Sequence, residues 1–332
     1  MHIIKILLDK DFRDKMVEKD IIDFFFRWRA VQFPPVLVPS MEWQNWLYLA
    51  TIGSDIATQY PVERGYCLRF CKNIIQFCQD CGEEVSELFY EKMGELHLQP
   101  PPSADSADYY KTYFLSSSDP HLTVSLREAK AVISGGTTGL SSWTAGEYLA
   151  CWLDGEDRAR LVEGKRVVEL GAGSGISGIF ALKRWRGILE YSFTDCHGKV
   201  LHNLGHNVER NCAGWSLVRE EPLEMLSEEG TLARVMDLNW EEFHEEVKLE
   251  ADVILGADLV FDPCLLPSLV KTLAILIKRG RDCEAFLVCC VRNEETWQLF
   301  IEQLGQAGLV VNTSLLEGDS TTPVCMAHVC KL

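Results

Sequence analysis

A glycine-rich stretch near the middle of the chain has residue types and spacing that suit a ligand-binding turn. Residues 166–180 read RVVELGAGSGISGIF, and the glycines at every second position are Gly171, Gly173 and Gly175. Glycine lets the backbone turn sharply, take positive φ and lie flat against a ligand. The apolar run before them predicts a buried parallel strand ending at Glu169, and residues 176–186 predict the following helix. Together these elements predict a ligand site at the carboxyl edge of a parallel sheet.

Glu169 indicates which ligand this turn accepts. The segment GSGISG at 173–178 also fits the G-x-G-x-x-G pattern of dinucleotide-binding folds. In those folds a pyrophosphate lies over the glycine turn, and the carboxylate of Glu169 would repel it. S-adenosylmethionine has no phosphate, and its ammonium, sulfonium and ribose hydroxyls suit acidic neighbours. We therefore expect S-adenosylmethionine as cofactor, with a turn used only for packing as the alternative.

A second acidic residue follows at the distance that such a site requires. Residues 189–195 predict the next strand, which ends at Asp195, about 20 residues after the glycines. A carboxylate in that place accepts hydrogen bonds from ribose hydroxyls. The alternative is that Asp195 only caps the next helix.

The elements that must position these residues alternate between strand and helix. Beyond the first two strands, the predicted strands are residues 235–240, 252–258, 286–291, 309–315 and 324–329. Helices are predicted at 144–153, before the first strand, and at 200–208. This alternation predicts a doubly wound α/β domain with ligands at the carboxyl ends of its strands.

The chain before this domain has a different character. Residues 1–98 show apolar positions at helical spacing and no nucleotide motif, which predicts a helical N-terminal region. Residues 99–108, QPPPSADSAD, predict a proline-rich linker. The α/β domain then occupies 109–332, and it opens with a predicted β-hairpin formed by residues 110–115 and 122–126.

Composition restricts the partners and the compartment. Lys plus Arg number 32 and Asp plus Glu 49, so the formal net charge is −17. This charge argues against nucleic acid as a direct partner and suits a basic protein surface. Thirteen cysteines, an odd number, occur without a signal-peptide pattern, which favours reduced thiols in the cytoplasm. No apolar run reaches the roughly 18 residues of a membrane span, so we expect no membrane association.

Two clusters raise the question of a metal site, and we expect none. Cys67, Cys71, Cys78 and Cys81 include one C-x-x-C pair, but the spacer between the pairs is too short for a zinc ribbon. A thiol-bearing helix face is the preferred interpretation. The histidines predicted on one helix are His197, His202 and His206, and a position at the surface or the edge of the core is favoured for them.

These motifs together resemble a known family. The runs VVELGAGSG at 167–175, FTD at 193–195, LNW at 238–240 and ADLVF at 257–261 resemble the seven-strand S-adenosylmethionine-dependent protein-lysine methyltransferases, a Rossmann-like fold. More narrowly, the chain resembles the elongation factor 2 lysine methyltransferases in GGTTGL at 135–140, TDCH at 194–197 and VRNEET at 291–296. The resemblance covers residues 110–332 well and the first 100 only in general character.

The resemblance assigns roles to single residues. It implies that cofactor is bound by Trp143, Glu169, Gly171, Gly173, Gly175, Asp195, Trp240 and Ala257. Asp258 and Phe261 match the family's acid-x-x-aromatic motif near the transferred methyl group. Two positions depart from the family, because Asn239 stands where many members have Asp and Phe261 where many have Tyr. The implied protein substrate is elongation factor 2.

Lysine methylation asks little covalent chemistry of the protein. The site must align the two reactants, exclude water and present a neutral amine, whereas with a pKa near 10.4 only about one free lysine in a thousand is neutral at pH 7.4. Asp258 is a candidate for orienting the amine or the methionine ammonium, and Phe261 for lining the lysine channel. Alternatives are methylation of another protein, of nucleic acid or of a small molecule, and a non-catalytic cofactor-binding module. The proline-containing motif of adenine amino-methyltransferases is absent at 258–261.

Overall fold

The computed structural model describes residues 12–34, 37–98, 109–119, 121–129, 138–318 and 320–332. The predicted linker 99–108 and the first part of the GGTTGL motif lie outside the described residues. Contacts divide the chain into two compact units. Unit 1 comprises Met1–Phe114 with Ser125–Arg127, and unit 2 comprises Leu115–Val124 with Glu128–Leu332. The short strands ahead of the α/β domain therefore group largely with the N-terminal region.

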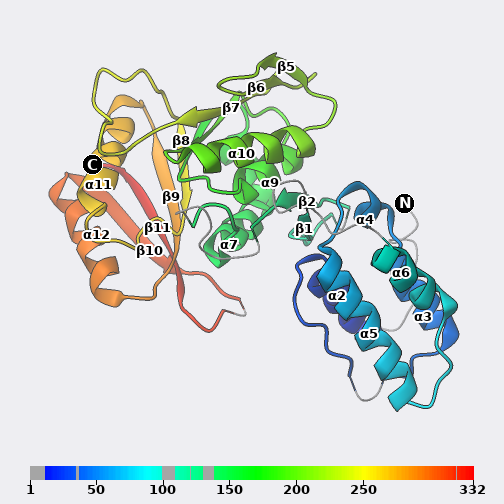
Figure 1. Cartoon of the computed structure of the whole chain (residues 1–332). Helices are drawn as coiled ribbons and strands as arrows, with labels where there is room; N and C mark the ends of the chain where they lie inside the picture. Colours follow the sequence, from blue (N-terminus) through cyan, green and yellow to red (C-terminus); the bar gives the residue numbers. More distant parts are fainter. Residues whose placement is uncertain (1–11, 35–36, 99–108, 120, 130–137, 319) are drawn as a thin grey trace. The chain divides into compact units, whose positions relative to one another are not determined.

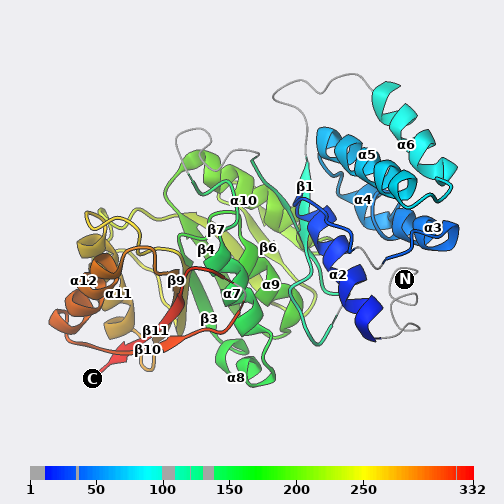
Figure 2. The same cartoon turned by 90° about the horizontal axis from the view of Figure 1, so that it is seen from below.

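Unit 1 is helical, as its sequence predicts. Its helices are α2 (Phe12–Phe26), α3 (Met41–Ala50), α4 (Asp55–Gln59), α5 (Arg64–Asp80) and α6 (Glu87–Leu98). Side chains cap the start of three of them: Ser40 Oγ accepts from Trp43 N, Ser54 Oγ from Ala57 N, and Glu63 from Gly65 N and Tyr66 N. α5 lies alongside α6 (Figure 2).

Aromatic side chains form the core of unit 1. Phe25, Phe26, Phe70 and Phe89 are fully or almost fully buried. The rings of Phe25 and Phe70 lie 4.6 Å apart between centroids, which joins α2 to α5. The strands β1 (Tyr110–Tyr113) and β2 (Val124–Arg127) form a separate two-stranded sheet, where the sequence predicts the hairpin.

Unit 2 is built on a nine-stranded sheet in the order β10-β11-β9-β8-β3-β4-β7-β6-β5. Its strands are β3 (Arg166–Leu170), β4 (Glu190–Asp195), β5 (Ser216–Arg219), β6 (Glu224–Leu226), β7 (Leu232–Asp237), β8 (Val253–Ala257), β9 (Glu284–Cys290), β10 (Leu309–Leu315) and β11 (Val324–Lys331). The central strands β7, β4, β3, β8 and β9 are parallel, and β11 runs antiparallel to both β9 and β10. The predicted doubly wound, Rossmann-like sheet is confirmed.

Helices cover both faces of this sheet. They are α7 (Thr144–Leu153), α8 (Ala159–Val162) after a 3-10 turn (Glu156–Arg158), α9 (Ile176–Arg184), α10 (Gly198–Asn211), α11 (Leu266–Arg279) and α12 (Glu294–Gln306). α7 packs on α9, and α11 packs on α12 (Figure 1). Val168 and Leu170 of β3 belong to the core under α11 and α12, whereas Glu169 points to α9, where its Oε2 lies close to Gly178. Successive side chains of β3 thus point to opposite faces of the sheet, with the apolar core on one face and Glu169 on the other.

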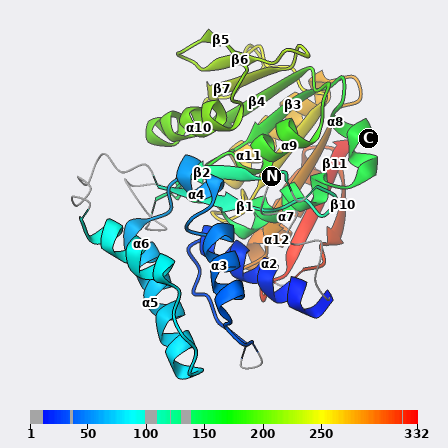
Figure 3. The same cartoon turned by 90° about the vertical axis from the view of Figure 1, so that its right-hand side faces the viewer.

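Two strands escaped the sequence analysis. All four residues of β5 are exposed, and β6 is only three residues long, so neither has an apolar pattern that would predict a strand. They extend the sheet antiparallel beyond β7, at the edge opposite β10 and β11 (Figure 3). β7 also ends at Asp237, which places Trp240 in the loop after the strand and not at its end. Within the described residues, no helix combines the length and the apolar character of a membrane span.

Candidate functional site

The glycine turn joins β3 to α9 with three residues in the left-handed region. Gly171, Gly173 and Gly175 have φ values of 58°, 56° and 89°. A Cβ at Gly171 would lie 2.6 Å from Leu259 Cδ2 and 3.6 Å from Trp240 Cζ2. Both the φ angle and the close neighbours therefore require glycine there.

A cavity of about 520 Å³ opens above this turn, at the carboxyl ends of β3, β4 and β8. The predicted site residues that line it are Trp143, Glu169, Gly171, Gly173, Asp195, Trp240, Ala257, Asp258 and Phe261. Gly175 is not part of the lining, since a Cβ there would lie 2.7 Å from Leu204 Cδ1 of α10. The structure thus brings together nine of the ten candidates and gives Gly175 a packing environment.

Asp195 is the last residue of β4, and its carboxylate holds the glycine turn in place. Its Oδ2 accepts a hydrogen bond from Gly173 N at 3.2 Å, and its Oδ1 accepts from Cys196 N at 2.8 Å and His197 N at 3.2 Å. Burial raises the pKa of Asp195, and these three N–H donors oppose that rise. The carboxylate borders the cavity, as the ligand role requires, and its hydrogen bonds go to the glycine turn and to the two residues that precede α10.

Glu169 is a buried acid, with 2% of its surface exposed. Burial raises its pKa to about 7, although Tyr191, Ser177 and Gly178 donate hydrogen bonds that favour the charged form. The Tyr191 hydroxyl donates to Glu169 Oε2 at 2.8 Å. A carboxyl group poised near neutrality on the wall of a cavity is typical of a functional site.

Asp258 has an unusual backbone conformation. It follows β8 directly and has a φ of 59°, one of two positive values among described residues other than glycine. Its carboxylate receives two hydrogen bonds from the guanidinium of Arg292, at 2.7 and 3.2 Å, and one from Cys290 N at 3.2 Å. Asp is one of the few residue types that adopt this backbone region, and the three hydrogen bonds hold its carboxylate in one place at the cavity wall.

Aromatic rings complete the wall. Trp143 precedes α7, and its Nε1 donates to Thr138 O at 3.2 Å. Phe261 is 59% exposed at the mouth of the cavity, which is high for a phenylalanine. Trp240 is partly buried against the core beneath α11.

Sequence reasoning missed several lining residues. They are Ser142, Ser174, Ile176, Ser177, Leu259 and Arg292. Ser174 and Ile176 lie inside the glycine motif, so its spacing could have indicated them. Arg292 belongs to the VRNEET run, but only the chain fold brings it to Asp258, 34 positions away.

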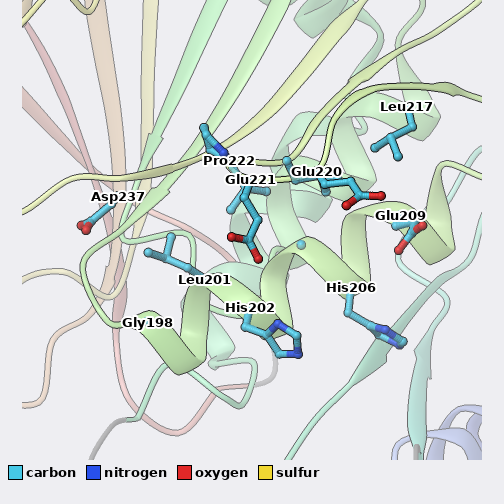
Figure 4. A pocket seen from close by; sticks show the side chains of 13 residues that line it. Gly198, Leu201, His202, His206, Glu209, Leu217, Glu220, Glu221, Pro222 and Asp237 are labelled. Carbon is cyan, nitrogen blue, oxygen red and sulfur yellow. The ribbon is translucent and has the colours of Figure 1, made fainter.

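A second hollow of about 560 Å³ lies between α10 and the edge strands β5 to β7. His202 and His206 leave the same side of α10, and Glu220 and Glu221 extend from the loop after β5 (Figure 4). His197 precedes α10 and lines the first cavity instead. In the part of the chain that the structure describes, no group of three or more side chains is arranged to hold a metal ion.

The cysteines of the N-terminal region also have clear positions. Cys67, Cys71 and Cys78 lie on the buried face of α5, and Cys81 is exposed just after it. Burial raises the pKa of Cys67 and of Cys71 to about 12. They form the thiol-bearing helix face that the sequence favours.

Comparison with known proteins identifies the family. A family model described as lysine methyltransferase matches residues 128–307. The human protein-lysine N-methyltransferase EEF2KMT is 31% identical over 264 residues, which cover 78% of this chain and 76% of that protein. The protein-lysine N-methyltransferase EFM3 of Chaetomium thermophilum is 30% identical and covers 81% and 80%. A solved structure of precorrin-6y C5,15-methyltransferase from Geobacter metallireducens aligns with a TM-score of 0.41 and 13% identity, over 62% of this chain and 94% of that one.

The sheet order and the cavity at the carboxyl ends of β3, β4 and β8 define a class of Rossmann-like methyltransferases. Within that class, the chain belongs to the lysine methyltransferase family. It is an S-adenosylmethionine-dependent protein-lysine N-methyltransferase.

Proposed function

We propose that the chain transfers methyl groups from S-adenosylmethionine to a lysine of translation elongation factor 2. The family gives the reaction, and the sequence resemblance together with the relative named EEF2KMT supports this substrate. We place the activity in the cytoplasm, where this factor works. The observation that carries the proposal is the cavity, because one cavity is lined by the acids Glu169 and Asp195 as well as by Asp258 and the exposed ring of Phe261.

The donor set of the cavity fits the cofactor. When bound, S-adenosylmethionine supplies a methyl group already activated on a sulfonium. We assign Asp195 to the ribose hydroxyls and Glu169 to the methionine ammonium, since carboxylates accept from the first and attract the second. We assign Trp240 to the face of the adenine ring. The Trp240 ring already lies beside Gly171, since a Cβ there would be 3.6 Å from its Cζ2. Gly173 leaves space for the cofactor, and Ala257 ends β8 at the cavity wall.

The remaining residues suit the methyl-transfer end. Trp143, Asp258 and Phe261 line one cavity, and Phe261 and Trp143 offer ring faces that attract a methylated ammonium product. Asp258 is held rigidly by Cys290 N and Arg292, so that its carboxylate keeps one orientation toward an incoming side chain. Alignment and exclusion of water are the contributions that this reaction needs.

Purified elongation factor 2 tests the proposal directly. The full chain is incubated with the factor and isotope-labelled S-adenosylmethionine, and the factor is analysed by mass spectrometry. We expect label on the nitrogen of a lysine side chain, and none with the Gly173→Arg variant. Label found only on another protein from a cell extract would favour the alternative substrate. Normal cofactor binding with no labelled protein would favour a non-catalytic module.

Unit 1 is our candidate for recognition of the substrate. α6 and the turn before it present an exposed acidic surface, formed by Glu83, Glu84, Glu87 and Glu91. Tyr90 on the same helix is 49% exposed. Exposed carboxylates beside an aromatic ring suit a basic patch on a folded partner. We propose that this acidic surface docks elongation factor 2.

A charge-matched pair of variants tests the docking surface. Replacing its four glutamates with glutamine should raise the KM for the factor several-fold and leave cofactor affinity unchanged, because docking charges act on encounter. The control replaces four exposed glutamates of unit 2, namely Glu228, Glu245, Glu246 and Glu302. Both variants lose four negative charges, so an equal rise of KM in both would reject a specific surface.

A further inference from the structure

Arg292 closes the end of the cofactor cavity at which Asp258 lies. Arg292 follows β9, and its Nη2 donates to Asp258 Oδ2 at 2.7 Å while its Nη1 donates to Oδ1 at 3.2 Å. Both carboxylate oxygens are thus engaged by one planar guanidinium. This two-pronged pairing fixes the geometry more strictly than a single contact between charges.

The pair is asymmetric in its exposure. The Asp258 side chain is 7% exposed, whereas that of Arg292 is 48% exposed. The guanidinium carbon of Arg292 lies 5.2 Å from the ring centroid of Trp143, so the arginine contacts both Asp258 and Trp143. The bond to Asp258 raises the pKa of Arg292, which therefore stays charged. A fixed cation stands where a substrate ammonium would otherwise be attracted.

We propose, on the basis of the proposed function, that Arg292 is a positioning residue that neutralises Asp258, so that the cavity accepts the substrate lysine as a neutral amine. In the reaction the lone pair of the lysine nitrogen forms the new N–C bond. The C–S bond breaks, and its electron pair stays on sulfur. The methylated nitrogen carries a positive charge and releases its proton to water. Only the neutral amine has the lone pair that starts this sequence.

Asp258 and Arg292 shift the pKa of a nearby lysine amine in opposite directions. A lone carboxylate within about 4–6 Å of an amine raises the pKa of that amine by about 1–3 units, and a neighbouring cation lowers it. Paired with Arg292, Asp258 still accepts a hydrogen bond but no longer favours the ammonium. Without Arg292, the lysine would be held in its unreactive charged form.

Other ionisable groups also lie near the Asp258–Arg292 pair. On β9, burial raises the pKa of Cys289 to about 12 and also raises that of Cys290, so both thiols are neutral at physiological pH. Glu147 of α7 interacts electrostatically with Cys290. The other charged or titratable groups of the cavity lining are Glu169, Asp195, Cys196, His197 and Glu241. All are common to the variants compared below, so their contributions cancel in the comparison.

The pH dependence of turnover tests the proposal, since it reports ionisations in the enzyme–substrate complex. With elongation factor 2 as substrate, kcat should rise with pH as the bound lysine loses its proton. Arg292→Gln should move this rise to higher pH by about one unit or more, and Arg292→Lys should restore most of the shift. Asp258→Asn should move it to lower pH, and asparagine tolerates the left-handed backbone there. The double variant should return close to the unaltered chain.

Two further measurements separate this role from a structural one. The affinity for elongation factor 2 is measured against pH in the presence of S-adenosylhomocysteine, when no transfer occurs. The unaltered chain should bind more tightly as pH rises, and Arg292→Gln should lose or reverse this trend. The control is Arg186→Gln, because Arg186 pairs with Glu229 on the surface and has 85% of its side chain exposed. It should change neither profile.

The outcomes distinguish the two proposals. Opposite shifts for Arg292→Gln and Asp258→Asn, with cofactor affinity within a few-fold, would support the neutralising role. Methylation of the factor with an unmoved pH profile in the folded Arg292→Gln variant would overturn this inference alone. No methylation of the factor by the unaltered chain would overturn the proposed function, and this inference with it.

Discussion

Buried thiols of unit 1 and a buried carboxyl group of unit 2 differ in whether they change charge near physiological pH. In unit 1, Cys67 and Cys71 lie in an aromatic core, and burial raises the pKa of each to about 12. In unit 2, burial raises the pKa of Glu169 from 4.5 to about 7, against three hydrogen-bond donors that favour its charged form. The thiols therefore stay neutral at every physiological pH, whereas Glu169 changes charge near neutrality. Burial moves the pKa of a thiol, ordinarily 9.0, further above physiological pH, whereas it moves the pKa of a carboxyl group, ordinarily 4.5, into that range.

The units also differ in how they use left-handed backbone. Gly82 of unit 1 has a φ of 73° and nothing within 4 Å of the position that a Cβ would take. Gly173 of unit 2 has a φ of 56° and lines the cavity, with Gly139 O at 3.4 Å from such a Cβ. The first glycine ends a helix, and the second shapes a ligand site. Gly82 therefore supplies a matched control in unit 1 for a substitution at Gly173.

The largest effect is expected from Gly173→Arg. The arginine side chain would enter the cavity at the position proposed for the cofactor, so calorimetry should detect no S-adenosylmethionine binding. Gly82→Arg carries a comparable backbone strain and should bind cofactor normally. Equal cofactor affinity in both folded variants would place the cofactor elsewhere.

Phe70→Ala should lower the stability of the chain and leave cofactor affinity unchanged. Phe70 is 2% exposed in the core of unit 1, and such a truncation typically lowers the free energy of unfolding by about 3–5 kcal/mol. Denaturant unfolding measures this loss. Because Phe70 does not line the cavity, the fraction that remains folded should bind cofactor with unchanged affinity. Weakened cofactor binding by folded molecules would show that the core of unit 1 supports the site.

Glu169→Gln should remove a pH dependence of stability. The folded chain holds a proton on Glu169 up to about pH 7, whereas an unfolded chain loses it near pH 4.5. The free energy of unfolding should therefore fall between these values, by up to about 3 kcal/mol, as pH rises. Chemical unfolding at a series of pH values measures this slope, and the glutamine variant should be flatter. An unchanged slope would mean that Glu169 is already ionised at low pH.

Asp195→Ala should have the smallest of these effects. A charged hydrogen bond to a hydroxyl contributes about 1.5–3 kcal/mol, so cofactor affinity should fall about tenfold or more. Asp195→Asn retains an acceptor for the N–H groups of the turn and should lose less. If alanine and asparagine give the same affinity as the unaltered chain in calorimetry, Asp195 serves only as a helix cap.

The sequence alone determined the parts that depend on local pattern. The glycine spacing predicted the turn between β3 and α9, and short apolar runs predicted the parallel strands, because both are properties of neighbouring residues. α7 and β10 have the predicted bounds. The chain order of the motifs also located eight of the lining residues through a family resemblance and a ninth, Ala257, beside them.

Only the tertiary structure decided the features that depend on distant residues. β5 is exposed on both faces and is held to β6 by backbone pairing and an ion pair between Arg219 and Glu224, which leaves no buried apolar pattern in the sequence. Gly175 belongs to the glycine motif, yet Leu204 of α10 closes off its side. Arg292 and Asp258 come from the ends of two neighbouring parallel strands, β9 and β8, and meet because those ends lie at one edge of the sheet. The charge balance of the site therefore arises from strand order, which no local pattern encodes.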